Sequence, residues 1–161
     1  MSIAILLFSF LSCGGSKTSE GYTLQKEAPF TVVKASSQKW IAGTPEGGSG
    51  LNFNFQIKDQ QGDIEFGDIY FQEKMTRVIP SRILNHYQGY FVNVMKNDKT
   101  MDINPANEMG NTPPVKIPFK LSKDEAIISY KVNGTMQYFK LKKVKEMPVL
   151  AYPKNNPNGI D

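Results

Sequence analysis

Apolar and polar residues alternate through the middle of the chain with the period of two that marks a half-buried β-strand. In residues 51–58 every second position is apolar and polar residues fill the positions between. This alternation predicts one face in a core and one in water. Residues 64–71 show the same pattern, but its phase changes at Gly67 and Asp68, which predicts a β-bulge there.

Residues 125–142 carry the pattern of a β-hairpin. Asn133 and Gly134 separate two alternating segments, and this dipeptide accepts the positive φ angles of a type I′ turn. A two-residue turn fixes the register of the strands. The predicted cross-strand pairs are Ile128 with Phe139, Ala126 with Leu141, Glu125 with Lys142, and Ser129 with Tyr138.

Further strands are predicted over residues 30–42, 75–79, 90–96 and 117–121. Because the last contains Pro118, which lacks an N–H, we expect it at a sheet edge. No segment shows the sustained three-to-four-residue apolar spacing of a helix. The sequence therefore predicts an all-β fold, an antiparallel β-sandwich or small barrel of about seven to eight strands.

The chain begins with an apolar run over residues 3–11 that ends at Ser12 and Cys13, after which the sequence turns polar. This layout is typical of an export signal, and the residues around Cys13 resemble the lipobox of bacterial lipoproteins. The resemblance implies that Cys13 becomes the acylated first residue of the mature protein. Its three acyl chains would then hold the protein durably at a membrane. The alternative is a soluble protein with an N-terminal apolar strand and a buried cysteine. No Lys or Arg precedes Ile3, so the true start lies upstream or the amino group alone supplies the charge.

This organisation divides the chain into four parts. Residues 1–12 are predicted as the lipoprotein signal peptide and residues 13–28 as the lipidated Cys13 with a flexible, Gly- and Ser-containing tether. Residues 29–152 are predicted to form the β-domain, and residues 153–161 a frayed tail rich in Pro and Asn.

Composition excludes several classes of protein. One Cys and one His cannot build a disulfide scaffold or a Cys/His zinc module. The apolar run is too short to span a bilayer as a mature helix, which argues against a channel. The net charge of +4 comes almost entirely from lysine without interleaved aromatic residues, so nucleic acid is a poor partner for an exported chain.

A glycine-rich loop next to Trp40 is the first candidate binding site. Its backbone N–H groups could meet an anion, or a partner's backbone could approach it closely. The alternative is a mobile connection between two strands, with Trp40 in the core. The candidate residues are Trp40, Gly43, Gly47, Gly48, Ser49 and Gly50.

Two other groups of side chains have both a functional and a structural interpretation. Oxygen ligands gather over residues 97–108, where they suit calcium or simply favour turns; they are Asn97, Asp98, Asp102, Asn104, Asn107 and Glu108. Strand alternation places Lys131, Lys140 and Lys142 on the solvent face of the hairpin, within a basic run that continues through Lys143 and Lys145. This run could contact anionic lipid headgroups or act as a solvated face that prevents aggregation.

The residues available for catalysis are few. His86 is the only imidazole, and its flanking sequence does not resemble a nucleophile elbow, although a Ser/His/Asp triad through it is arithmetically possible. A glycosidase with two carboxylates leaves no local pattern and stays open. We predict no catalytic residue, metal or cofactor.

Five segments of the chain carry a further resemblance: residues 11–13 (LSC), 39–43 with 47–50 (KWIAG and GGSG), 110–114 (GNTPP), 125–130 (EAIISY) and 151–153 (AYP). As a set they resemble small lipoproteins of the Bacteroidota, particularly of flavobacteria. The resemblance implies a lipid-anchored envelope domain and carries no activity, cofactor or catalytic residue with it.

Three hypotheses follow for function. The first is a non-enzymatic, lipid-anchored β-domain of the cell envelope, expected at the outer membrane. It would bind a protein or glycan through the glycine-rich loop or an exposed strand edge, since edge pairing requires no special residue. The second is an envelope hydrolase or glycan-processing enzyme, and the third a purely structural envelope protein.

Overall fold

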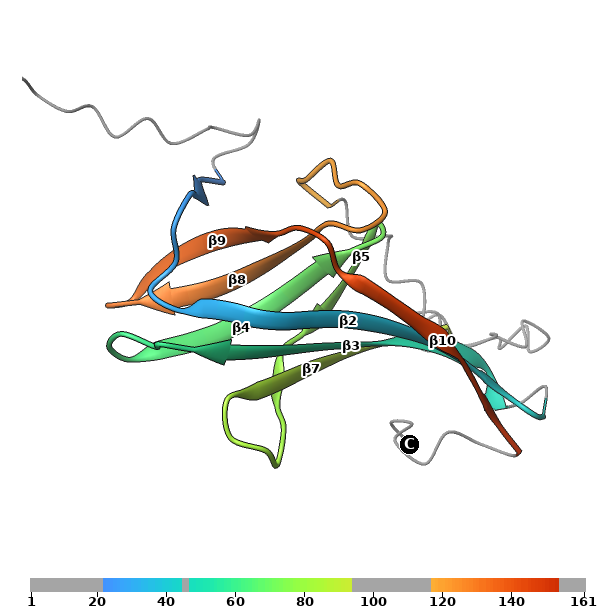
Figure 1. Ribbon diagram of the computed structural model, residues 1–161. Coiled ribbons are helices and arrows are strands. Elements are labelled where there is room, and N and C mark those ends of the chain that lie inside the picture. The colour runs from blue at the N-terminus through green and yellow to red at the C-terminus, as the bar shows by residue number, and fades with distance from the viewer. Residues whose placement is uncertain (1–21, 45–46, 94–116, 154–161) are drawn as a thin grey trace, which may run out of the picture.

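The computed structural model describes residues 22–44, 47–93 and 117–153, which form a β-sandwich of two five-stranded sheets (Figure 1). Its strands are β1 (Leu24–Gln25), β2 (Thr31–Ala42), β3 (Ser49–Lys58), β4 (Ile64–Phe71), β5 (Lys74–Arg77), β6 (Ile79–Pro80), β7 (His86–Asn93), β8 (Ala126–Val132), β9 (Thr135–Leu141) and β10 (Lys145–Tyr152). Within the described residues there is no α-helix, so the predicted all-β fold is confirmed.

The strands are ordered β1-β9-β8-β4-β5 in one sheet and β10-β2-β3-β7-β6 in the other. The inner pairs are antiparallel, but β1 pairs with β9 and β10 with β2 in parallel. Both sheets are therefore mixed, and the sandwich is not closed into a barrel. The chain crosses from one sheet to the other at Val78, whose N–H donates to the Gly67 carbonyl oxygen at 2.8 Å. This crossing divides the strand predicted over residues 75–79 into β5 and β6.

The inner faces of the two sheets form the main core. Phe53, Phe55 and Ile57 of β3 are each at most 2% exposed, as the alternation over residues 51–58 predicted. They pack against β4 and β8, with the Phe53 and Phe71 ring centroids 5.2 Å apart in an edge-to-face arrangement. Edge-to-face aromatic pairs of this kind stabilise a core beyond the area they bury.

The predicted bulge in β4 is present. The pairing of β4 with β8 shifts register between Phe66 and Ile69, and the Asp68 N–H donates to Ser129 Oγ at 2.7 Å. A Cβ added at Gly67 would lie 2.6 Å from that hydroxyl, so glycine alone leaves room for it. The buried Ser129 side chain therefore replaces the ladder partner that the bulge removes.

The predicted hairpin is also confirmed. Asn133 and Gly134 have φ angles of 50° and 76°, and the ladder pairs Ile128 with Phe139, Ala126 with Leu141, and Ser129 with Tyr138. The prediction for Glu125 was wrong, because the ladder ends at Ala126 and Leu141. The Glu125 carboxylate instead accepts hydrogen bonds from Lys140 Nζ at 2.9 Å and the Ser122 N–H at 3.1 Å.

A second apolar cluster covers the outer face of β8 and β9, and two predictions fail there. Residues 117–121 form no strand; Phe119 instead packs edge-to-face on Tyr70, with ring centroids 5.2 Å apart. Residues 22–28, predicted as part of the tether, belong to the packed domain: β1 pairs with β9, and the Tyr22 ring lies 5.0 Å from that of Tyr138. Both segments bury the apolar outer face of the hairpin, which would otherwise lie in water.

Strand β10 was not predicted, because Pro148 interrupts its alternation. The structure accommodates the proline at a sheet edge, in a register shift between Met147 and Leu150, and Gln38 Nε2 donates to the Pro148 carbonyl oxygen at 3.0 Å. The pairing of β10 with β2 begins only at Ser36. The first part of β2, residues 31–35, therefore has no neighbour on that side among the described strands.

Candidate functional site

Two unpaired strand edges face each other at one side of the sandwich. On β2 the open edge covers residues 31–35, and on β9 it begins after Phe139, where the pairing with β1 ends. Alternate N–H and C=O groups of such an edge point away from the sheet and are available to a partner. This side of the molecule therefore offers backbone hydrogen bonds that the described part of the fold leaves unused.

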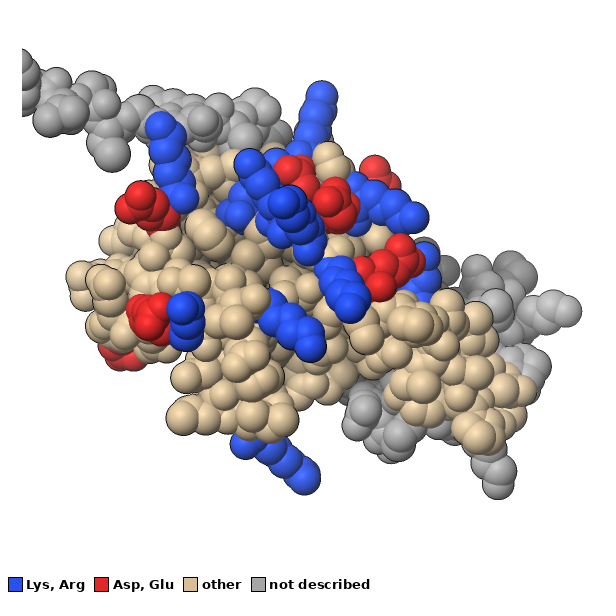
Figure 2. All heavy atoms as spheres, viewed as in Figure 1, with Lys and Arg blue, Asp and Glu red and all other residues tan. Residues whose placement is uncertain are grey.

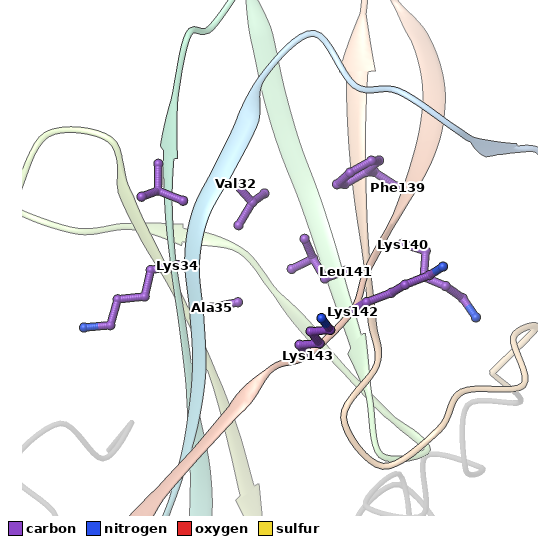
Figure 3. Close-up of a pocket in the computed structure, with 9 residues that line it drawn as sticks. Val32, Lys34, Ala35, Phe139, Lys140, Leu141, Lys142 and Lys143 are labelled. Atoms are coloured by element: carbon purple, nitrogen blue, oxygen red, sulfur yellow. The ribbon is translucent and has the colours of Figure 1, made fainter.

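A groove of about 340 Å³ lies between these edges. Figure 3 shows Val32 and Ala35 of β2 pointing toward Phe139 and Leu141 of β9 across it. Leu141 belongs to the buried core, and Val32, Ala35 and Phe139 are half-buried against it, so the floor of the groove is apolar, while polar atoms make up the larger part of its exposed lining. The lining residues are Val32, Val33, Lys34, Ala35, Phe139, Lys140, Leu141, Lys142 and Lys143.

The charged residues of the groove are all lysines. Lys34 extends to the far side of β2, Lys140 and Lys142 extend to the outer side of β9, and Lys143 lies at the end of the groove (Figure 3). Lys140 is paired with Glu125, but among the described residues no carboxylate lies within 4.0 Å of the other three amines. Lys and Arg also gather on the upper part of the face in Figure 2, interleaved with Asp and Glu. The groove therefore has a positive rim around an apolar interior.

The backbone at Lys143 adopts a conformation that lysine rarely takes. Its φ is 62°, at the point where the chain crosses from β9 in one sheet to β10 in the other. The next residue, Val144, is buried and donates its N–H to the Asp124 carbonyl oxygen at 2.9 Å, which holds the crossing in place. Left-handed backbone at a non-glycine residue costs of order 1–3 kcal/mol and clusters at binding sites. It fixes the direction in which the Lys143 side chain leaves the chain.

The basic run predicted from the sequence divides between the two sheets. Lys131 lies on the outer face of the hairpin near Glu65, with Nζ and Oε2 3.6 Å apart, and Lys145 begins β10 beside Ser36. Only Lys140, Lys142 and Lys143 reach the groove, where they join Lys34. Sequence reasoning missed Lys34 because the unpaired edge of β2 depends on where the unpredicted β10 begins.

The displaced pKa values lie outside the groove interior. The hydrogen bond from Lys140 lowers the pKa of Glu125, and Lys39 lowers that of Glu146 through an ion pair 3.2 Å long. Burial, with a smaller contribution from Asp68, raises the pKa of Tyr70 to about 12. Each shift moves the group away from neutral pH, whereas general acid–base catalysis requires the pKa to approach it.

Trp40 belongs to the packing of the sandwich and is not an exposed platform. It is 2% exposed, and its ring lies edge-to-face with Tyr152, with centroids 6.1 Å apart. It also lies directly over Gly50, where an added Cβ would be 2.7 Å from the indole ring. Trp40 therefore lies in the packed interior, which is the alternative to a binding platform that the sequence analysis gave.

Close backbone approach or a positive φ angle accounts for Gly43, Gly48 and Gly50 beside Trp40. A Cβ on Gly43 would lie 2.5 Å from the Pro153 carbonyl oxygen, and Gly48 has a φ of 67°. The Gly47 N–H donates to the Thr44 carbonyl oxygen at 3.1 Å, and Ser49 begins β3. These residues form the connection between β2 and β3, of which residues 45–46 lie outside the described part. A partner-binding role for this loop stays a prediction.

The remaining candidates lie apart from the groove or outside the described residues. His86 Nδ1 is 2.9 Å from the Leu84 carbonyl oxygen, at a second pocket of about 290 Å³ that includes Tyr87 and shares Lys34 with the groove. Cys13 and the oxygen-rich residues 97–108 lie outside the described residues. Within the described ranges, no group of three or more His, Cys, Asp or Glu is placed to hold a metal ion. The same ranges contain no helix long and apolar enough to cross a membrane.

Comparisons with protein-family models, with curated proteins and with solved structures give no match for this chain. The resemblance to lipoproteins of the Bacteroidota therefore stays a prediction, and the fold and the groove are the basis for any functional proposal.

Proposed function

We propose that the protein is a non-enzymatic binding module, anchored to the cell envelope through lipid on Cys13, whose groove between β2 and β9 binds an acidic ligand. The groove carries this proposal, because it combines an apolar interior, four lysines and two open strand edges. The apolar run that ends at Cys13 supports the envelope location.

The two components of the groove have different physical roles. Exposed ion pairs contribute at most about 1 kcal/mol each, so the lysine rim mainly selects acidic ligands and accelerates their association. The half-buried side chains of Val32, Ala35 and Phe139 supply the apolar area that a ligand removes from water, at about 25 cal/mol per Å². A ligand with both acidic and apolar groups therefore suits the groove better than a simple anion.

The anchor is tested by the variant Cys13→Ser in a bacterium that processes lipoproteins. In the wild type we expect loss of residues 1–12, an acyl mass on Cys13 and recovery with the membrane fraction, because signal cleavage depends on lipidation of the cysteine. Cys13→Ser should abolish all three, as intact-mass spectrometry and membrane fractionation would show. An uncleaved, soluble wild-type protein would contradict the anchor and make residues 3–11 part of the fold.

The acidic ligand is tested by reversing two rim charges together, Lys34→Glu and Lys143→Glu. With fluorescein-labelled poly-L-glutamate as the probe, we expect fluorescence anisotropy to show an affinity about tenfold or more lower, since each reversal turns an attraction into a repulsion. The wild-type affinity should also fall as salt is raised.

The control for this experiment is Lys74→Glu, which reverses one charge where the test variant reverses two. Lys74 is an exposed lysine on β5, an edge strand that β4 and β8 separate from β9 in the same sheet. Lys74→Glu changes the net charge in the same direction as the double variant but alters no residue of the groove. Equal affinities of the wild type and the double variant, or an equal loss in Lys74→Glu, would show that the groove does not select the acidic probe.

A further inference from the structure

We infer that the ligand of the groove is an extended peptide segment that adds a strand to β2 at residues 31–35, with apolar side chains facing the groove and acidic side chains beside Lys34. This inference rests on the proposed function and names the class of its ligand. It follows from the backbone edge, the order of side chains along that edge and the position of Lys143.

The backbone argument starts from what β10 leaves uncovered. β10 pairs in parallel with β2 from Ser36 onward, so an added segment would lie in line with β10 and extend the same sheet. At about 3.3 Å per residue, the open stretch of β2 accommodates four to five residues of an extended chain. Main-chain hydrogen bonds to such an edge supply affinity without a particular sequence.

The side-chain argument supplies the sequence preference. Figure 3 shows Val32 and Ala35 pointing into the groove and Lys34 pointing to the other face of β2. The pairing of β2 with β3 shifts register between Val32 and Lys34, so Val32 and Ala35 share a face although they are three positions apart. An added strand that follows this irregularity places one residue beside Val33 and Lys34, and its two neighbours beside Val32 and Ala35. Apolar residues then fit beside Val32 and Ala35, against Phe139 and Leu141, and an acidic residue fits beside Lys34.

The end of the groove adds a second cation. The chain crosses from one sheet to the other at residues 142–144, so an added strand must stop there. The Lys143 amine lies at this point, and the left-handed backbone conformation fixes its direction. A carboxylate at the end of the segment, from a side chain or a C-terminus, is therefore the complementary group.

A peptide accounts for more of these features than an anionic membrane surface does. Lipid headgroups would engage the lysines of the rim but leave the apolar side chains and the backbone edge of β2 without a partner. A peptide of alternating apolar and acidic residues uses the edge, the apolar interior and the rim together. The inferred ligand is accordingly an envelope or exported protein with such a segment at an exposed end or loop.

The test uses the full-length protein and a fluorescein-labelled hexapeptide of alternating glutamate and valine. Two N-methylated isomers of the peptide, methylated at odd or at even positions, block one or the other hydrogen-bonding edge of the strand. We expect one isomer to bind about tenfold more weakly than the parent and the other to keep its affinity. Lys34→Glu should also weaken binding of the parent peptide several-fold, while Lys74→Glu should leave it unchanged.

The outcomes separate this inference from the proposed function. If both methylated isomers bind like the parent, strand addition is wrong although the groove still binds acids. If poly-L-glutamate or vesicles containing an anionic lipid bind in a manner sensitive to Lys34→Glu but the hexapeptide does not, the peptide is the wrong ligand. If no acidic probe binds, both the inference and the proposed function fail.

Discussion

Replacing Phe53 with alanine is expected to lower the free energy of unfolding by about 3–5 kcal/mol, the range typical of buried phenylalanine. Phe53 is fully buried on β3 and contacts Phe71 of the opposite sheet edge-to-face. Its removal leaves a cavity between the two sheets that their rigid ladders cannot close by collapsing. Urea denaturation followed by circular dichroism measures the difference.

The control for Phe53→Ala is Leu84→Ala, at a leucine that is 84% exposed in the connection before β7. A substitution of this kind should change the free energy of unfolding by no more than about 0.5 kcal/mol. If Phe53→Ala and Leu84→Ala destabilise equally, the packing of the two inner faces described above is wrong.

Gly50→Ala is the second large effect that we expect, a loss of about 1–3 kcal/mol from adding a single methyl group. The new Cβ would lie 2.5 Å from the Phe91 carbonyl oxygen and 2.7 Å from the Trp40 ring. Neither neighbour moves freely, because the first is backbone of β7 and the second is an almost fully buried indole. Thermal or urea unfolding should show the loss, accompanied by a changed Trp40 emission spectrum.

Ser49→Ala serves as the control for Gly50→Ala because it changes the neighbouring residue of the same strand. It adds no atom near Trp40 and should leave the Trp40 spectrum unchanged. A wild-type stability for Gly50→Ala would show that Trp40 does not occupy the face of Gly50. The indole would then be free to act as the platform that the sequence left open.

Local patterns in the sequence predicted the parts of the fold that depend on neighbouring residues, namely short turns, a bulge, and a strand with one apolar and one polar face. The alternation over residues 51–58, the bulge at Gly67 and the turn at Asn133 are each specified by a few adjacent residues. All three are present in the structure. In each case the side-chain period and the backbone requirement point to the same conformation.

The failures occur where distant segments decide the structure. β10 contains Pro148, and its conformation depends on an edge of β2 more than 100 residues away, to which Gln38 contributes a hydrogen bond across 110 positions. Residues 117–121 have the composition of a strand, but Phe119 is needed to cover Tyr70 and the outer face of the hairpin. Tertiary packing overrides local propensity in both places.

The groove could be predicted only in part. The basic run is visible in the sequence, but its division between two sheets is not, and Lys34 lies about 100 positions away from Lys140. The free edge of β2 is the difference between the length of that strand and the stretch that β10 covers. The sequence of β2 alone therefore does not reveal its free edge, because the length of that edge depends on where β10 begins.

The parallel pairing of β10 with β2 also has a consequence for how the chain reaches its native state. β2 pairs with β3 across a short connection in the sequence, but β10 follows β2 by more than 100 positions, as the separation of 107 between Lys39 and Glu146 shows. Contacts of such high sequence separation form late, because loop closure must precede them. During synthesis, the whole edge of β2 therefore stays open until β10 has been made. A newly made chain that meets another copy in this interval exposes a twelve-residue strand to mispairing. By pairing with β2 from Ser36 to Ala42, β10 therefore protects most of this edge from aggregation.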